Sequence, residues 1–190
     1  MKKNELYPVF LKVTQLQILI VGGGNVAFEK LFFLLKSSPN ANVHLVAPDI
    51  SNEVLKLCEL HNVIVYYKDY RINMLKEKQI VIAATNNDTV NKQIYEDSKK
   101  LNVLINVADN PKYCDFYLGG IVNKGNVKIA ISTNGQSPTI AKRIRQFLEE
   151  IIPENIDDLV LNLNSYRTKF KNDFQKKVST LNQLTKDLIT

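Results

Sequence analysis

Two features of the sequence carry residue types that can do chemistry. One is the glycine run Gly22–Gly24, and the other is Asp109, a carboxylate that directly follows an apolar run. The glycines open the pattern G-x-G-x-x-A, in which Gly22 permits a tight turn and Gly24 permits close approach of the backbone to a pyrophosphate. Ala27 is small enough for close packing of helix on strand, and the helix start adds free N–H groups. The pattern predicts a dinucleotide-binding loop, with a glycine turn without ligand as the alternative.

Further candidate contacts for a dinucleotide follow other apolar runs. Asp49, in VAPD, is placed to bind ribose hydroxyls. No arginine occurs in the next residues, Ile50 to Asn52, so nothing there would hold a 2′-phosphate, which favours NAD over NADP. Asp49 can equally be a turn or helix-capping residue. Thr85 and Asn86, in AATNND, can hydrogen-bond a cofactor or be ordinary loop residues.

Asp109 follows VLINVA and precedes Asn110 and Pro111. A carboxylate at this place can accept a proton as a general base. It can also form an Asx-type turn before the proline. The residues alone leave both interpretations open.

The elements that must position these residues alternate along the first half of the chain. Apolar runs predict strands over 17–21, 42–47, 63–67, 79–84 and 103–107. Helical spacing predicts helices over 25–36, 51–61 and 88–101, with Ser51 and Asp88 as N-caps. This alternation predicts an α/β fold, a Rossmann-type doubly wound parallel sheet. Asp49 and Asp109 then lie at the carboxyl edge of the sheet, where such folds bind ligands.

The pattern changes after residue 113. The runs 116–122 and 127–133 flank NKGN and predict an antiparallel hairpin. Ser137 and Pro138 predict a helix start, and Pro153 its end. Two amphipathic helices follow, with apolar residues every three or four positions over 156–174 and 178–188. We expect a nucleotide-binding domain over 1–113, a dimerisation hairpin and helix start over 114–145, and a C-terminal helical domain over 146–190.

Composition excludes several classes of function. The chain is 45% hydrophobic and 23% charged, as globular proteins are, with a net charge of +6. The two cysteines and two histidines have no metal-ligand spacing, so we expect no metal site. Basic and aromatic residues do not interleave, so we expect no nucleic-acid partner. Without an apolar run of membrane length or a signal peptide, we expect a cytoplasmic protein and no membrane partner.

Several segments together resemble one family. They are YPVFLKV, ILIVGGGNVAFEK, AATNNDTVN, NVADNPKYCDF and IAISTNGQSPTIAKRIR, in this order. The chain through about residue 153 resembles precorrin-2 dehydrogenases, a family that includes the N-terminal part of sirohaem synthases. The resemblance implies a Rossmann domain, a dimerisation region and a helical C-terminal domain in a homodimer. It implies NAD-dependent oxidation of precorrin-2 to sirohydrochlorin, and some members also insert iron or cobalt.

The resemblance also implies roles for particular residues. Cofactor contacts map to Asn25, Val26, Pro48 and Asp49. Asp109 matches the family's catalytic aspartate, which favours general-base catalysis over a turn alone.

A substrate that carries carboxylates gives the basic residues of the helix after Ser137 a possible purpose. Lys142, Arg143 and Arg145 can bind such arms or form a solvated basic face. Ser137 matches a serine that is phosphorylated beside the substrate region in a relative. Asn134 stands where the family often has glycine, and asparagine tolerates left-handed backbone. The alternative from another class is a non-enzymatic NAD-sensing domain, which needs the glycine loop but not Asp109.

Overall fold

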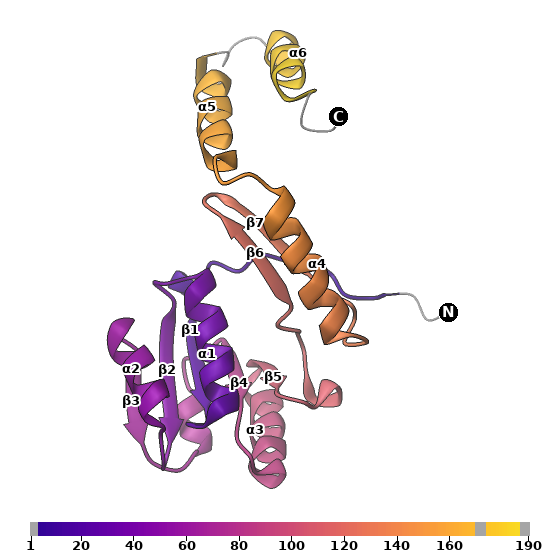
Figure 1. The fold of residues 1–190 in the computed structure, drawn as a ribbon. Coiled ribbons are helices and arrows are strands. Elements are labelled where there is room, and N and C mark those ends of the chain that lie inside the picture. Colours follow the sequence, from indigo (N-terminus) through magenta and orange to yellow (C-terminus); the bar gives the residue numbers. More distant parts are fainter. Residues whose placement is uncertain (1–3, 170–173, 187–190) are drawn as a thin grey trace. The chain divides into compact units, whose positions relative to one another are not determined.

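The computed structural model describes residues 4–169 and 174–186, which form two compact units, one ending at Leu118 and the other starting at Gly119. The first unit is built on a five-stranded parallel sheet in the order β3-β2-β1-β4-β5 (Figure 1). Its strands are β1 (Gln17–Val21), β2 (Asn42–Ala47), β3 (Ile64–Tyr67), β4 (Ile80–Ala83) and β5 (Leu104–Val107). Its helices are α1 (Asn25–Ser37), α2 (Asn52–Leu60) and α3 (Asp88–Leu101), with short 3-10 turns η1 (Val13–Gln15), η2 (Ile72–Leu75) and η3 (Pro111–Tyr113).

This sheet confirms the predicted doubly wound fold. Its two faces carry separate apolar cores. On one face Ile18 and Ile20 of β1 pack with Leu31 of α1 and Val54 of α2. On the other face the alternate residues of β1 pack with Ile94 of α3 and with η2. The central strands are unbroken runs of Val, Ile and Leu because both of their faces are buried.

The strand β3 differs from the central strands, since it lies at the edge of the sheet and Ile64 and Tyr67 are exposed. One local prediction needs correction. Helix α3 is capped by Asn87 and not by Asp88: the Asn87 side chain accepts hydrogen bonds from the N–H groups of Thr89 and Val90. Asparagine and aspartate are both common N-cap residues, so the sequence alone does not show which of these two neighbours is the cap.

The second unit begins with an antiparallel hairpin of β6 (Gly120–Lys124) and β7 (Val127–Ile131). Gly125 takes φ +58° in the two-residue turn, as the NKGN signal predicts, although the strands are shorter than the predicted runs. Helix α4 (Pro138–Ile151) packs on this hairpin around buried Val122, Ile131 and Ala141.

The predicted helix start is confirmed in detail. Ser137 Oγ accepts a hydrogen bond from Ile140 N at 3.2 Å, and Pro138 is the first helical residue. Helix α4 runs without a break across the boundary that we placed at residue 145. Two more helices follow, α5 (Ile156–Lys169) and α6 (Phe174–Thr185), as amphipathic spacing predicts, although Phe174 begins the second helix and was predicted to belong to the first. Residues 170–173 and 187–188 of the predicted stripes lie outside the described residues. Within the described residues, no helix has the length and apolar character needed to cross a membrane.

Candidate functional site

The loops that carry the predicted cofactor residues leave the sheet at one edge. Val21 of β1 pairs with Val46 of β2 and with Ala83 of β4, and Ala83 pairs with Val107 of β5. The four strands therefore end level with one another. The strand order reverses between β1 and β4, and ligands of open α/β sheets bind outside the carboxyl ends at such a reversal.

The first two glycines of the loop are required by the protein itself. A Cβ on Gly22, whose φ is +133°, would lie 2.3 Å from the carbonyl oxygen of Ala84. A Cβ on Gly23 would lie 2.2 Å from the carbonyl oxygen of Asp49. Gly23 also accepts a hydrogen bond from Ser51 N at 2.9 Å, so the glycine loop is fastened to the loop after β2. Sequence reasoning missed Gly23, and three successive glycines were the available signal.

Gly24 differs from both neighbours because a Cβ there would meet nothing within 4 Å. It is the N-cap of α1, and no side chain caps this helix, whereas Ser51, Asn87 and Ser137 cap α2, α3 and α4. The first turn of α1 therefore presents open N–H groups beside free space. Those groups and the helix dipole suit a pyrophosphate, so the loop fits a bound dinucleotide.

Other predicted cofactor residues surround this helix start. Asn25 and Val26 are exposed in the first turn of α1, so both are accessible to a ligand. Pro48 and Asp49 are exposed in the loop after β2. The Asp49 carboxylate has no ion-pair partner within residues 4–169 and 174–186. It is therefore free to accept hydrogen bonds from hydroxyl groups.

Thr85 and Asn86 lie in the loop after β4, but their side chains are not equally available. Thr85 Oγ1 lies 2.7 Å from Oδ1 of the buried Asn91 and 3.1 Å from the Asn87 carbonyl oxygen. Asn91 Nδ2 in turn donates to the Thr85 carbonyl oxygen at 3.0 Å. Thr85 therefore shapes the loop, and Asn86 stays exposed. Asn91 was missed, although it shares a helix face with apolar Ile94.

Asp109 occupies a turn with strained backbone. The turn runs from Val107 to Asn110 and is closed by a hydrogen bond from Asn110 N to the Val107 carbonyl oxygen at 3.3 Å. Asp109 is its third residue and takes φ +58°. Glycine and asparagine suit that place best. Asp109 is therefore a turn residue, although glycine or asparagine would fit its backbone conformation better. Its exposed side chain has no hydrogen-bond or ion-pair partner within the described residues. Strain of this kind often accompanies function.

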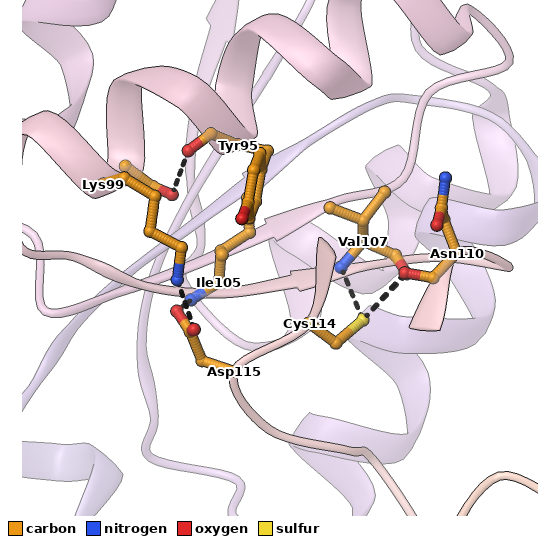
Figure 2. A network of polar contacts seen from close by, with 8 residues as sticks. Tyr95, Lys99, Ile105, Val107, Asn110, Cys114 and Asp115 are labelled. Atoms are coloured by element: carbon orange, nitrogen blue, oxygen red, sulfur yellow. Dashed lines mark hydrogen bonds and ion pairs between the residues drawn. The ribbon is translucent and has the colours of Figure 1, made fainter. Parts of the chain in front are cut away.

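The chain after Asp109 folds back along β5 (Figure 2). Asp115 N donates to the Ile105 carbonyl oxygen at 2.8 Å, and Asp115 Oδ2 accepts from Ile105 N at 3.1 Å. Asp115 is also ion-paired with Lys99 of α3. These contacts explain why the first unit extends to Leu118, past the boundary that we placed at residue 113.

The predicted substrate residues lie on α4 in the second unit. Lys142 and Arg143 are exposed, and Arg143 donates to Gln146 Oε1 at 3.2 Å. Arg145 is half-buried and ion-paired with Glu149 at 2.5 Å. Ser137 Oγ is used as a helix cap. Asn134 has φ +55°, the left-handed conformation expected for a residue in place of glycine.

A metal centre is not evident from the geometry. Within residues 4–169 and 174–186, no three or more His, Cys, Asp or Glu side chains gather in a way that could hold an ion. Burial raises the pKa of the Cys58 thiol to about 11. Burial likewise raises the pKa of Cys114, against a hydrogen bond from the Val107 backbone that acts in the other direction.

Comparison with known proteins identifies two family models on this chain. Residues 9–120 match a family described as putative NAD(P)-binding, and residues 124–151 match the central part of sirohaem biosynthesis proteins. A siroheme synthase of Psychrobacter cryohalolentis is 35% identical over 175 residues, which cover 92% of this chain and 32% of that protein. A siroheme synthase of Ruthia magnifica is 34% identical over 167 residues, 88% of this chain and 35% of that protein.

The chain thus spans about a third of the length of these curated relatives. Among solved structures, one titled "SirC, precorrin-2 dehydrogenase" superimposes with a TM-score of 0.77 at 24% identity. The match covers 94% of this chain and 89% of that one. At this level of identity the likeness supports the fold.

Proposed function

The chain belongs to the family described as putative NAD(P)-binding, whose model matches residues 9–120, and from that premise we propose that it is an NAD-dependent precorrin-2 dehydrogenase. It would oxidise precorrin-2 to sirohydrochlorin. The observation that carries the proposal is the uncapped start of α1, with free space at Gly24, on the same edge of the sheet as Asp109.

The reaction removes a hydride and a proton from the macrocycle. The nicotinamide cofactor, when bound, accepts the hydride. The α1 N–H groups at Asn25 and Val26 would hold the pyrophosphate, and Asp109 would accept the proton. Its exposed carboxylate is free to do so because no neighbouring side chain in the described part of the chain engages it.

We propose NAD and not NADP as the cofactor. The Asp49 carboxylate suits two ribose hydroxyl groups and would repel a 2′-phosphate. Competitive titration tests this choice: NAD should bind the protein more tightly than NADP, and Asp49→Asn should narrow the difference. Equal affinity of the wild-type protein for both nucleotides would contradict the assignment.

The substrate carboxylates would be bound by basic residues of α4. Lys142 has no ion-pair partner in the described residues, whereas Arg145 is neutralised in part by Glu149. Arg143 makes only a neutral hydrogen bond to Gln146. Charge reversal at Lys142 or Arg143 should therefore raise the KM for precorrin-2 and leave the affinity for NAD unchanged. An unchanged KM in both variants would indicate that this basic face is a solvated surface that does not bind the substrate.

A homodimer is the assembly that we propose. Helix α4 exposes an apolar stripe of Ile140, Ile144, Phe147 and Ile151, at spacings that place all four on one side of the helix. An exposed apolar stripe of this kind marks a contact surface. Light scattering should give the mass of a dimer for the wild-type chain and of a monomer for Phe147→Glu. A monomeric wild-type chain would refute this assembly.

The central experiment mixes the purified protein with NAD and precorrin-2 and follows NADH by its absorbance. NADH should appear in proportion to the precorrin-2 consumed, and Asp109→Asn should stop its formation without loss of NAD binding. Binding of NAD without turnover would instead favour a nucleotide sensor. A separate incubation with sirohydrochlorin and ferrous iron or cobalt, followed by the tetrapyrrole spectrum, tests whether the protein also inserts metal.

A further inference from the structure

The thiol of Cys114 lies against the turn that carries Asp109, and the proposed reaction does not use it. Its sulfur is 3.3 Å from Val107 N, 3.3 Å from the Val107 carbonyl oxygen and 3.3 Å from the Asn110 carbonyl oxygen (Figure 2). Val107 precedes Asp109 and Asn110 follows it. One side chain therefore contacts both ends of the strained turn.

The thiol is suited to bridge these groups. Its sulfur can accept the Val107 N–H while its single proton is donated to the carbonyl oxygen of Val107 or of Asn110. The turn's own hydrogen bond, from Asn110 N to Val107, is long at 3.3 Å. The hydrogen bonds of the Cys114 thiol therefore restrain a turn that its own backbone hydrogen bond holds only weakly.

The position of Cys114 is fixed by its neighbours. Asp115 is bonded to Ile105 through both its backbone N–H and its carboxylate. Asn106, a buried polar residue of β5, donates from Nδ2 to the Phe116 carbonyl oxygen at 2.8 Å. The sulfur is thus held against β5 from its C-terminal side. Because Asp115 and Phe116 are hydrogen-bonded to β5, the position of the sulfur relative to the turn is fixed.

We propose that Cys114 is a positioning residue for the dehydrogenase reaction: its thiol joins Val107 to Asn110 and so holds the Asp109 carboxylate at the sheet edge. This inference rests on the proposed function, in which Asp109 accepts the proton. Proton transfer depends on short distances, so a base on a loosened turn spends less time within reach of the substrate.

The test compares variants of the full chain. Cys114→Ala should lower kcat on the order of tenfold and leave the Kd for NAD unchanged, because the glycine loop is intact. Cys114→Ser keeps a donor and an acceptor and should restore most of the lost rate. The matched control is Cys58→Ala, which removes the other thiol of the first unit, a buried one on α2. It should lower Tm through a core cavity and leave kcat unchanged below that temperature.

A second arm separates this inference from the function on which it rests. In an Asp109→Asn background, Cys114→Ala should cause no further loss, since the group that it positions is gone. If Asp109→Asn is inactive and Cys114→Ala keeps normal kcat, the positioning role is overturned and the proposed function stands. If Asp109→Asn keeps normal turnover, the proposed role of Asp109 fails first. Should the alanine variant fail to fold, Cys114→Val keeps most of the volume without the hydrogen bonds, and a normal kcat in it overturns the inference.

Discussion

Gly24→Ala should separate cofactor binding from folding. A Cβ at Gly24 meets nothing within 4 Å, and its φ of −98° is open to any residue. Alanine is a poorer N-cap than glycine but loses less chain entropy on folding, so the free energy of unfolding should change by less than about 1 kcal/mol. The methyl group would occupy space needed for the pyrophosphate. We expect at least a tenfold weaker NAD affinity, which corresponds to about 1.4 kcal/mol.

The two preceding glycines provide controls in the same loop. Alanine at Gly22 or Gly23 would place Cβ 2.3 or 2.2 Å from a backbone oxygen, far inside ordinary contact distance. The backbone would have to move, at a cost of about 3 kcal/mol for such overpacking. For a chain of this size that cost lowers Tm by roughly 6–12 °C.

Thermal unfolding without ligand and calorimetric titration with NAD measure both quantities. Gly24→Ala should keep its Tm within about 4 °C of wild type and lose NAD affinity. Wild-type affinity in Gly24→Ala would refute the argument that this space receives the pyrophosphate. A Tm loss as large as that of Gly22→Ala would refute the argument that Gly24 is free of structural demands.

Three further predictions concern other parts of the molecule. Asp109→Asn should be as stable as wild type or more stable by up to about 1 kcal/mol, since asparagine suits the left-handed turn, and yet form no NADH; an active variant would show that Asp109 is a turn residue alone. Gly125→Ala should destabilise the second unit by about 1–3 kcal/mol in thermal unfolding, because its φ of +58° strains alanine and its Cβ would lie 2.2 Å from Asp157 Cγ; Asp157→Ala should relieve the part due to the contact, and strict additivity of the two changes would contradict the clash. Burial and the charge of Lys78 lower the pKa of His44 from 6.5. The free energy of unfolding should therefore fall as the pH drops below 6.5, because the unfolded chain binds a proton there more readily than the folded one. His44→Gln should weaken this pH dependence of the unfolding free energy measured in urea, and an unchanged pH dependence would contradict the reasoning.

The sequence predicts the first unit well because local signals suffice there. The boundaries of β1 and β2 match their apolar runs, since a glycine turn and a proline loop bound them. Ser137 and Pro138 likewise specify the start of α4 by themselves. The carboxyl-edge location of Asp49 and Asp109 follows from strand order alone.

Other features depend on neighbours that are distant in the chain. Gly23 is required by the Asp49 backbone, and Asn91 is buried because it completes the loop at Thr85. The hydrogen bond between the Cys114 thiol and the Asp109 turn forms only because the chain returns along β5. The exposure of β3 likewise follows from its place at the sheet edge, which the apolar run itself does not reveal.

The return of the chain along β5 also limits how far the sheet can grow. The outward N–H groups of an edge strand are open to pairing with a strand of another molecule, a common route to aggregation. At β5 these groups are occupied: Ile105 N is bonded to the Asp115 carboxylate and Val107 N to the Cys114 sulfur. A carboxylate and a thiol thus terminate the hydrogen-bond ladder where a sixth strand would otherwise add. The segment that holds the Asp109 turn therefore also protects the β5 edge of the sheet against edge-to-edge polymerisation.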